Sequence, residues 1–419
     1  MLRRARAPRL CMVVHGPYPV GEPRVARETA AALAAGWDVD VVAMRRDGEP
    51  ARELVEGATV YRLPLTHQRG GGVRQILAEY VGFATLAALR VAALASRRRY
   101  DVVHVHNPPD FLVLAALYPR LLGAKVVFDV HDLSPDMFEM RFEGRSFAPL
   151  ADRVLRGLER AAIRAADLVV TVHEPYRREL LARGAAPEST VVVMNSQDES
   201  LLPAATDQAA AAEFRVVYHG TVTRSYGLDL LVEAAALARR RIPALRVEIY
   251  GGGDAVEELR SQSADLGVAD IVHVDGEYRP HREILAAVAG ASAGVIPNRP
   301  SRLNRFALSS KLFEYVALGV PVVSANLPTL AEHFTSDAVA FFEAGSAEAL
   351  AEALVEVASD PGAAASRVAA ARREYEPYRW PRQAEMYVAA LRELAGGATS
   401  RAGGEPATRP RWRRAQRPV

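Results

Sequence analysis

The stretch VVYHGTVTRSYGLDLL, from Val216 to Leu231, contains a complete unit of local structure. It begins with a short apolar run, passes through a loop at Gly220 and Thr221, and ends in a leucine-rich helical pattern. Short apolar runs separated by helices are typical of parallel strands that are covered on both faces. The stretch therefore predicts an α/β fold, and the rest of the chain repeats the same alternation.

Valine-rich runs that read as strands fall into two sets. The first set is LCMVVHG, DVDVVAM, ATVYRLP, DVVHVHN, KVVFDVHD, DLVVTVHE and TVVVMNS, and the second is FRVVYHG, RVEIYGGG, IVHVDGE, SAGVIPN, VPVVSAN and AVAFFEAG. Between them, residues 196–212 lack periodicity and collect Ser, Asp, Pro and Gln, which indicates a domain boundary. The pattern predicts two doubly wound, Rossmann-like parallel-sheet domains.

The predicted first domain covers residues 1–196 and the second covers 197–371. Residues 372–394 are expected to form helices that cross back to the first domain, and residues 395–419 a disordered basic tail. Ligands of open α/β sheets bind at the carboxyl ends of the strands. The expected binding site is therefore a cleft that both domains face.

Composition excludes several classes of protein. Lys and Arg total 52 against 50 Asp and Glu, a formal net charge of +2, which argues against a nucleic-acid binder. The single cysteine, Cys11, excludes an internal disulfide framework and a cysteine-based zinc cluster, and its apolar neighbours predict a buried position. No apolar run suits a signal sequence or approaches the roughly 20 residues that span a bilayer, so a cytoplasmic protein is expected.

The loop after the first strand, HGPYPVGEPRVARE, places Gly16 in a turn and begins a helix near Arg24, whose free amides suit an anion. The second strand ends at Met44, where a nicotinamide enzyme usually has an acid that binds ribose, so that class is disfavoured. Asp38 and Asp40 match the D-x-D of metal-dependent sugar transferases. They open a strand at the edge away from the cleft, however, so a solvated strand start is expected.

The segment VVFDVHDLSPD carries the candidate catalytic residues, His131 and Asp132. They follow Asp129 at the end of a strand, and flanking carboxylates can fix the tautomer and basicity of a histidine. His104 and His106 alternate along the preceding strand and could suggest a metal. No third ligand has suitable local spacing, so packing or loop contacts are expected for these two side chains.

The segment SSKLFEYVALGVPVV, from Ser309 to Val323, contains a candidate anion site. Ser309 or Ser310 can cap a helix whose first amides are free. Lys311 in the first turn opposes the helix dipole, so a negative ligand would justify it. Glu314 could accept two hydrogen bonds from a ribose diol, whereas a solvated ion pair between Lys311 and Glu314 is the alternative.

Two glycine loops precede helices in the second domain. In the first, Gly220 and Arg224 could meet a phosphate group, although Arg224 could equally be a plain surface arginine. In the second, EIYGGGDAVEELR, consecutive glycines including Gly252 let the backbone approach a ligand closely.

With these residues placed, the chain resembles the retaining glycosyltransferases of family 4, which have the two-domain GT-B fold. The most specific segments are SSKLFEYVALGVPVV, VVYHGTVTRSYGLDLL, FDVHDLSPD and EPRVARE, which are similar to those of members that build bacterial surface polysaccharides. The resemblance implies transfer from a nucleotide sugar, held by the second domain, to a glycan or polyprenyl-lipid-linked acceptor, held by the first. It implies retention of anomeric configuration and neither a metal nor a cofactor.

The resemblance also assigns roles to single residues. It implies that Glu314 holds the ribose of the donor, that Lys311 and Arg224 contact its diphosphate, and that His131 lies beside the transferred sugar. The remaining positions it implies are Gly220, Ser309, Ser310, Glu277 and Tyr278, all on the donor side. Gly252 on the donor side, and Gly16 and Arg24 in the first-domain loop, are candidates from their own local sequence. Phe306 stands where many members have a first glutamate, and Tyr226 where many have a lysine, which leaves the donor sugar open.

Two other functions stay open from the sequence. A nucleotide-sugar 2-epimerase shares the two-domain architecture, and a non-catalytic nucleotide-sugar binding protein would be consistent with Phe306 and Tyr226. The acceptor chemistry also predicts contact with an anionic inner membrane. Two segments could provide it: the apolar stretch from Arg74 to Arg99, either as an interfacial helix or packed on the first sheet, and the arginines around Trp412 in the tail.

Overall fold

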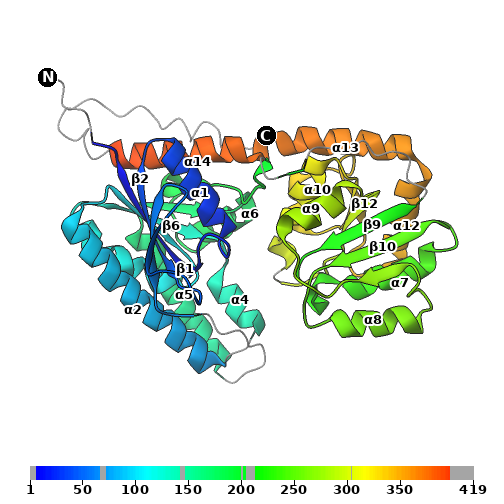
Figure 1. Cartoon of the computed structure of the whole chain (residues 1–419), viewed down its shortest axis with the longest axis horizontal. Coiled ribbons are helices and arrows are strands. Elements are labelled where there is room, and N and C mark those ends of the chain that lie inside the picture. Colours follow the sequence, from blue (N-terminus) through cyan, green and yellow to red (C-terminus); the bar gives the residue numbers. More distant parts are fainter. Residues whose placement is uncertain are drawn as a thin grey trace. The chain divides into compact units, whose positions relative to one another are not determined.

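The computed structural model describes residues 6–66, 72–141, 147–199, 202–203, 213–302 and 304–396. The chain divides into two units, residues 1–195 with 381–419 and residues 196–380. Each unit is a β-sheet with helices on its faces (Figure 1). Residues 397–419, which hold most of the predicted basic tail including Trp412, lie outside the described residues.

The sheet of the first unit has the strand order β3-β4-β2-β1-β5-β6-β7-β8. The strands are β1 (Arg9–Pro17), β2 (Asp38–Met44), β3 (Arg52–Val55), β4 (Ala58–Leu63), β5 (Val102–His106), β6 (Lys125–Val130), β7 (Leu168–Thr171) and β8 (Thr190–Val192). All neighbours pair in parallel except β3, which runs antiparallel to β4 at the edge. Leu10, Met12 and Phe128 are fully buried, as expected for central strands covered on both faces.

Helical segments connect these strands. They are α1 (Pro23–Ala34), α2 (Val73–Arg97), η1 (Asp110–Ala116), α3 (Leu117–Leu121), α4 (Ser134–Arg141), α5 (Ala148–Ala165), α6 (Glu174–Ala182) and η2 (Pro187–Ser189). The helix α14 (Trp380–Gly396) belongs to this unit from Pro381 onward. Its Gln383 side chain accepts a hydrogen bond of 2.8 Å from the amide of Met194, which fixes the helix to the end of the first unit.

The sheet of the second unit has the order β11-β10-β9-β12-β13-β14, and all its neighbours pair in parallel. The strands are β9 (Phe214–His219), β10 (Leu245–Tyr250), β11 (Val272–Val274), β12 (Ala293–Ile296), β13 (Val322–Ala325) and β14 (Ala340–Phe342). The helical segments are η4 (Arg224–Tyr226), α7 (Leu228–Ala238), α8 (Val256–Asp265), α9 (His281–Ala289), η5 (Asn304–Phe306), α10 (Ser310–Leu318), α11 (Pro328–His333), α12 (Ala347–Ser359), α13 (Pro361–Tyr375) and η6 (Glu376–Tyr378).

Strand order identifies the expected ligand edge of each sheet. The order reverses between β1 and β5 in the first unit and between β9 and β12 in the second. In doubly wound sheets a crevice opens at such a reversal, outside the carboxyl ends of the strands. The residues that follow β1, β5 and β9 are therefore the first to consider for function.

The predicted fold class, two doubly wound parallel-sheet domains, is confirmed. The edge strand β3 was not predicted, because its sequence RELV has exposed side chains and lacks an apolar run. The solvated strand start predicted for Asp40 is wrong, since this carboxylate is 3 % exposed and accepts a 2.6 Å hydrogen bond from Tyr100. Cys11, paired with Asp40 in the β1–β2 ladder, is fully buried as predicted.

The helix α2 corrects a further expectation. It has 25 residues and is long and apolar enough, by length and composition alone, to cross a membrane, so the prediction that no run approaches this length is wrong. One side of α2 is buried in the first unit through Phe83, Ala87 and Val91. This packing is the arrangement of a helix that covers a sheet.

Candidate active site

Lys311 and Glu314 lie in the first turns of α10, whose N-cap is Ser309. The ammonium nitrogen of Lys311 lies 5.1 Å from the ring centre of Tyr218 and 5.2 Å from that of Tyr226. Its side chain also crosses Gly220, which has a φ of 117° and where an added Cβ would lie 2.7 Å from Lys311 Cε. Glycine is thus required at 220 both by the backbone angle and by the lysine.

The charge of Lys311 has no carboxylate at ion-pair distance within the described part of the chain. Burial lowers the pKa of Lys311 to about 8, although Glu314 favours the charged form. Two aromatic rings stabilise an ammonium group but leave its outer N–H donors free. The arrangement is that of a desolvated cation at a helix N-terminus, where an anion would be bound by both.

Glu314 is 3 % exposed and contacts two histidines. Its Oε2 lies 3.1 Å from Nε2 of His219 at the end of β9, and its Oε1 lies 3.7 Å from Nε2 of His281 at the start of α9. Because the carboxylate is buried and pairs with histidine, the solvated ion pair with Lys311 does not form.

The other predicted donor-side residues surround the same strand ends. Ser310 begins α10 next to the cap residue Ser309. Tyr278 is 68 % exposed, and Gly252 lies beneath it, since an added Cβ at Gly252 would come within 2.8 Å of the Tyr278 ring. Arg224 is exposed at the start of η4 and pairs with Glu258 at 2.7 Å.

The two departures from the family pattern have defined surroundings. Tyr226, where many members have a lysine, supplies one of the rings that contact Lys311. Phe306, where many members have a glutamate, lies in η5 with the guanidinium of Arg305 4.3 Å from its ring centre. Lys311, which lies against the Tyr226 ring, thus provides a positive charge beside the loop in which many family members have a lysine.

In the first unit a buried carboxylate, Asp129, organises the strand ends. Arg24 donates two hydrogen bonds to it, of 3.0 and 3.1 Å, and a third of 2.7 Å to the carbonyl of Val193. The Oδ2 atom of Asp129 also lies 3.3 Å from Nε2 of His131 and 3.5 Å from Nδ1 of His106. The guanidinium of Arg24 is therefore fully engaged, and Arg24 positions Asp129 from α1.

Opposing shifts of pKa divide this cluster into charged and neutral groups. The cluster contains a second buried carboxyl, that of Glu28, and burial favours the neutral acid at both Glu28 and Asp129. At Glu28, burial raises the pKa well above its usual value. At Asp129, Arg24 and the histidines outweigh burial and hold the pKa well below its usual range. Burial also lowers the pKa of His104 and His106, whose side chains are fully buried and packed as predicted.

Four of these side chains could in principle hold a metal ion. One ligand atom each from Glu28, His104, His106 and Asp129 lies within 4.8 Å of the others. The cation that they face is already supplied by Arg24, which pairs with both carboxylates and lies 3.1 Å from Glu28. We therefore assign the cluster to charge-paired packing, and Tyr387 of α14 completes it by a 2.9 Å contact with His104.

His131 and Asp132 lie at the outer edge of this cluster. Asn107 fixes their backbone, since its side chain accepts from the amide of His131 at 2.8 Å and donates to the carbonyl of Asp132 at 2.7 Å. Nε2 of His131 lies close to Asp129 and His106, and no hydrogen bond of Nδ1 is found among the described residues. A ligand could therefore be contacted through Nδ1. Burial raises the pKa of Asp132.

Glu22 joins His131 and Asp132 at this edge. It is the N-cap residue of α1, but its carboxyl makes no capping hydrogen bond and instead lies against Gly16, where an added Cβ would clash with it. Burial raises the pKa of Glu22 to about 7, while His131 lowers it and Asp132 raises it. No role was predicted for Glu22 from the sequence, although it opens the segment EPRVARE.

We expect Glu22 to titrate near pH 7, well above an ordinary glutamate. Removing the negative charge in Asp132→Asn should lower this pKa, and removing the imidazole in His131→Ala should raise it. The measurement is a pH titration of ¹³C-carboxyl-labelled glutamates by NMR, with Glu22→Gln to assign the signal. A midpoint in the ordinary range of about 4–5 would contradict the geometry of this edge.

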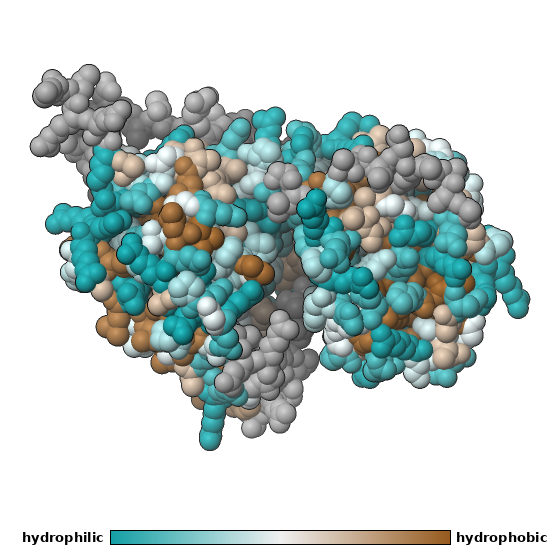
Figure 2. All heavy atoms as spheres, viewed as in Figure 1, coloured by the Kyte–Doolittle hydropathy of each residue, from teal (hydrophilic) through white to brown (hydrophobic). Residues whose placement is uncertain are grey.

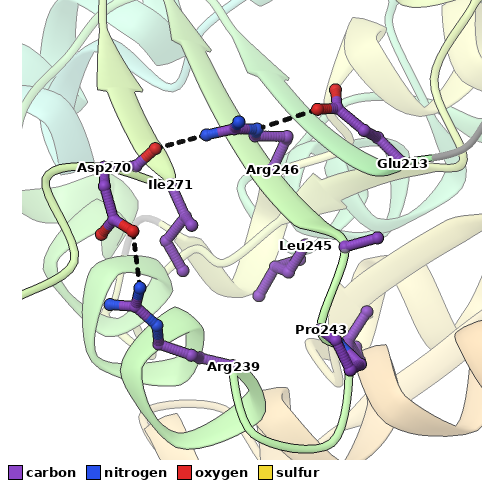
Figure 3. A pocket seen from close by; sticks show the side chains of 9 residues that line it. Glu213, Arg239, Pro243, Leu245, Arg246, Asp270 and Ile271 are labelled. Carbon is purple, nitrogen blue, oxygen red and sulfur yellow. Dashed lines mark hydrogen bonds and ion pairs between the residues drawn. The ribbon is translucent and has the colours of Figure 1, made fainter.

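The structure also contains a cavity of about 480 Å³ at the opposite edge of the second sheet (Figure 3). Its lining includes Leu245 at the beginning of β10 and Ile271 just before β11, so it lies at the amino ends of the strands. Its two arginines are paired, Arg239 with Asp270 and Arg246 with Glu213. A nucleotide site is expected at the carboxyl ends of the strands, with a positive charge available to the phosphates. This cavity lies at the other edge of the sheet, and both of its arginines are paired.

Two parallel-sheet units with polar groups at the carboxyl ends of their strands are the architecture of the GT-B sugar-transferring enzymes. Residues 20–196 match the glycosyl transferase 4-like domain, and residues 213–360 match the glycosyl transferases group 1 domain. Together, the two domain matches show that the chain is a glycosyltransferase of the family 4 type.

Three similar proteins illustrate the relationship. A D-inositol 3-phosphate glycosyltransferase of Acidothermus cellulolyticus is 27 % identical, over 90 % of this chain and 86 % of its own. The amylovoran biosynthesis glycosyltransferase AmsK of Erwinia amylovora is 25 % identical over 50 % of this chain and 52 % of its own. The structure of Anabaena HepE in complex with UDP and glucose has a TM-score of 0.65 and 17 % identity, over 94 % of this chain and 99 % of its own. This likeness confirms the fold.

Proposed function

We propose that this protein transfers a sugar from a nucleotide-sugar donor to a glycan or polyprenyl-lipid-linked acceptor, with retention of anomeric configuration, in cell-surface polysaccharide synthesis. The observation that carries the proposal is the pair of Lys311 and Glu314 at the start of α10, beside Gly220 at the reversal of the second sheet. A desolvated cation and a buried carboxylate on one helical turn match the diphosphate and the ribose of such a donor.

The remaining donor contacts follow from the same strand ends. The amides at Ser309 and Ser310 and the backbone at Gly220 would bind the diphosphate, and exposed Arg224 would reach it by leaving Glu258. Tyr278 over Gly252 offers an exposed ring for the nucleobase. The UDP and glucose bound to the similar protein HepE support a donor of this class.

Retention follows if the leaving diphosphate helps to deprotonate the acceptor hydroxyl on the face of the sugar from which it departs. Lys311 and the first amides of α10 would stabilise the negative charge that develops on the phosphate, which is the largest contribution expected in such a site. His131, held by Asp129, would contact the transferred sugar. Asp132, the neighbouring candidate catalytic residue, would assist His131. Because protein cations neutralise the diphosphate, we expect turnover to continue in EDTA.

A membrane-borne acceptor is supported by an exposed apolar surface on the first unit, which we name the α2–α3 surface. It comprises Leu77, Val81 and Leu89 of α2, Leu114 of η1, and Leu117 and Leu121 of α3, which are 48–84 % exposed. The hydroxyls of Ser96 and Tyr118 join α2 to α3 at 3.2 Å. Brown, hydrophobic atoms gather in Figure 2 over the region where Figure 1 draws α2.

The charges around this surface suit anionic lipid. Arg74, Arg90 and Arg97 are exposed on α2. The acid of this helix, Glu79, is turned inward, where it pairs with His15 at 3.1 Å and is 10 % exposed. We therefore propose that the protein is cytoplasmic and rests peripherally on the inner face of the membrane, with the basic tail as a second contact.

The α2–α3 surface predicts binding to vesicles that contain anionic lipid. Leu89→Asp and Leu121→Asp should each weaken binding about tenfold or more, because each loses roughly 1.5–3 kcal/mol of apolar burial and adds a repelled charge. Raising the salt concentration and deleting residues 397–419 should weaken it further. The measurement is vesicle co-sedimentation, with Leu237→Asp as matched control, since Leu237 is 51 % exposed in the second unit. Equal loss in that control would remove the assignment.

The proposed activity is tested by incubating the protein with UDP-, GDP- and dTDP-sugars in EDTA, with and without a membrane lipid extract as acceptor. We expect release of the nucleoside diphosphate from one donor, dependent on the extract. Conversion of a nucleotide sugar without acceptor would identify the epimerase alternative, and binding without any turnover would identify the binding protein.

A further inference from the structure

His219 lies at the last position of β9, where the strand order of the second sheet reverses. Its Nε2 atom is 3.1 Å from Oε2 of Glu314, and both side chains are buried, 5 % and 3 % exposed as residues. The imidazole packs edge-on against the ring of Tyr315, with 5.4 Å between ring centres and 88° between planes. The ring is thereby fixed in the plane that meets the carboxylate.

The two ends of the Glu314 carboxylate have different surroundings. Among the described residues, Oε2 of Glu314 and Nε2 of His219 have no hydrogen-bond partner besides their mutual contact. The other oxygen, Oε1, faces His281 at 3.7 Å, beyond hydrogen-bond distance, and the His281 side chain is 49 % exposed. The carboxylate thus has a closed side at His219 and an open side at Oε1, which faces the half-exposed His281.

The charged and titratable groups that act on His219 are Glu314, Lys311 and His281. Burial lowers the pKa of His219, although Glu314 favours its charged form. A neutral imidazole with its proton on Nε2 can donate to the glutamate anion without adding a charge beside Lys311. A donor on one side of a carboxylate restricts its rotation and leaves the remaining lone pairs directed to the other side.

We propose that His219 is a positioning residue that holds Glu314 with its open oxygen toward the ribose diol of the nucleotide. The inference rests on the proposed function, because it assumes that Glu314 binds ribose. In this role His219 acts only through Glu314 and does not itself touch the nucleotide. A histidine that only fills the core would stabilise the second unit but would have no preference for one part of the ligand.

Calorimetry of the variants His219→Ala and His219→Gln tests this role. Two probes are compared. The first is whichever of UDP, GDP and ribothymidine diphosphate binds the wild type best, and the second is the 2′,3′-dideoxy form of that same nucleotide. His219→Ala should lose about tenfold in affinity for the ribonucleotide, the size of one charge-assisted hydrogen bond, and little for the dideoxy form. His219→Gln, whose amide can donate, should recover part of the loss. The control is His273→Ala, an exposed histidine of the same unit.

A readout without nucleotide is the ¹⁵N NMR spectrum of the histidine ring. His219 should show the Nε2–H tautomer in the wild type and lose this preference in Glu314→Ala. The Nδ1–H tautomer, or equal losses for both nucleotides in a folded His219→Ala, would overturn the inference. The ribose contact itself is wrong if the wild type does not distinguish the ribonucleotide from its dideoxy form and Glu314→Gln does not distinguish them either. In that case the proposed function fails instead.

Discussion

Replacing Glu314 with glutamine or Lys311 with alanine is expected to weaken nucleotide binding by about 10- to 150-fold each. The range corresponds to the roughly 1.5–3 kcal/mol contributed by a hydrogen bond to a charged group. Glutamine keeps the shape of the buried Glu314 side chain but loses the negative charge that a diol would face. Alanine at 311 removes the cation that two tyrosine rings and Gly220 hold in place.

The fold should survive both changes, which separates a binding loss from unfolding. Lys311 is desolvated without a carboxylate at ion-pair distance among the described residues, so its charged form destabilises the unliganded protein. Calorimetry gives the affinities, and thermal unfolding without ligand gives the control. Unchanged affinity in both folded variants would contradict the donor site.

The same lysine sets an expected pH dependence. Its pKa is lowered to about 8 by burial, and a bound diphosphate would raise it again. Below pH 8 the cation is already present, so affinity for a nucleotide sugar should be constant. Above pH 8 binding must take up a proton, and affinity should fall. This fall should be absent in Lys311→Ala.

Replacing His131 with alanine is expected to lower turnover by about 100-fold or more while changing donor affinity little. The reason is its proposed position: Nε2 contacts Asp129 and His106, and Nδ1, which has no hydrogen bond among the described residues, would face the transferred sugar. A group that interacts more strongly in the transition state than in the ground state changes kcat more than binding.

The matched comparison for His131→Ala is Asp132→Asn, which changes the neighbouring candidate while keeping the imidazole. Far-ultraviolet circular dichroism checks folding, because His131 borders the buried cluster around Asp129. Wild-type turnover in a folded His131→Ala protein would remove its catalytic assignment. A protein that does not fold would instead indicate that His131 serves the core.

The fold, and the positions of the candidate residues at strand ends and at the start of a helix, were predictable because their signals are local. Apolar runs followed by helices gave the parallel strands, and the two serines before Lys311 gave the start of α10. The strand β3 was missed because it pairs at an edge with exposed side chains. Asp40 was misjudged because its partner, Tyr100, is 60 positions away in the chain.

The partners of the candidate residues were not predictable, since sequence spacing does not show which strand ends meet. Glu28 and Asp129 join His104 and His106 only through the strand order of the folded sheet. Tyr387 reaches His104 from 283 positions away. In the same way, His219 and Glu314 are brought together by a strand and a helix, and neither residue predicts the other.

The most direct test of the account is the anomeric configuration of the product. The donor is the nucleotide sugar that releases its nucleoside diphosphate when a lipid acceptor is present. The protein converts it in EDTA, and the coupling constant of the new anomeric proton is measured by NMR before side reactions accumulate. We predict that the new linkage has the same configuration as the donor and that, at limiting donor concentration, it forms at least tenfold more slowly with Glu314→Gln or Lys311→Ala. A linkage of inverted configuration, or product formed at the wild-type rate by both variants, would contradict it.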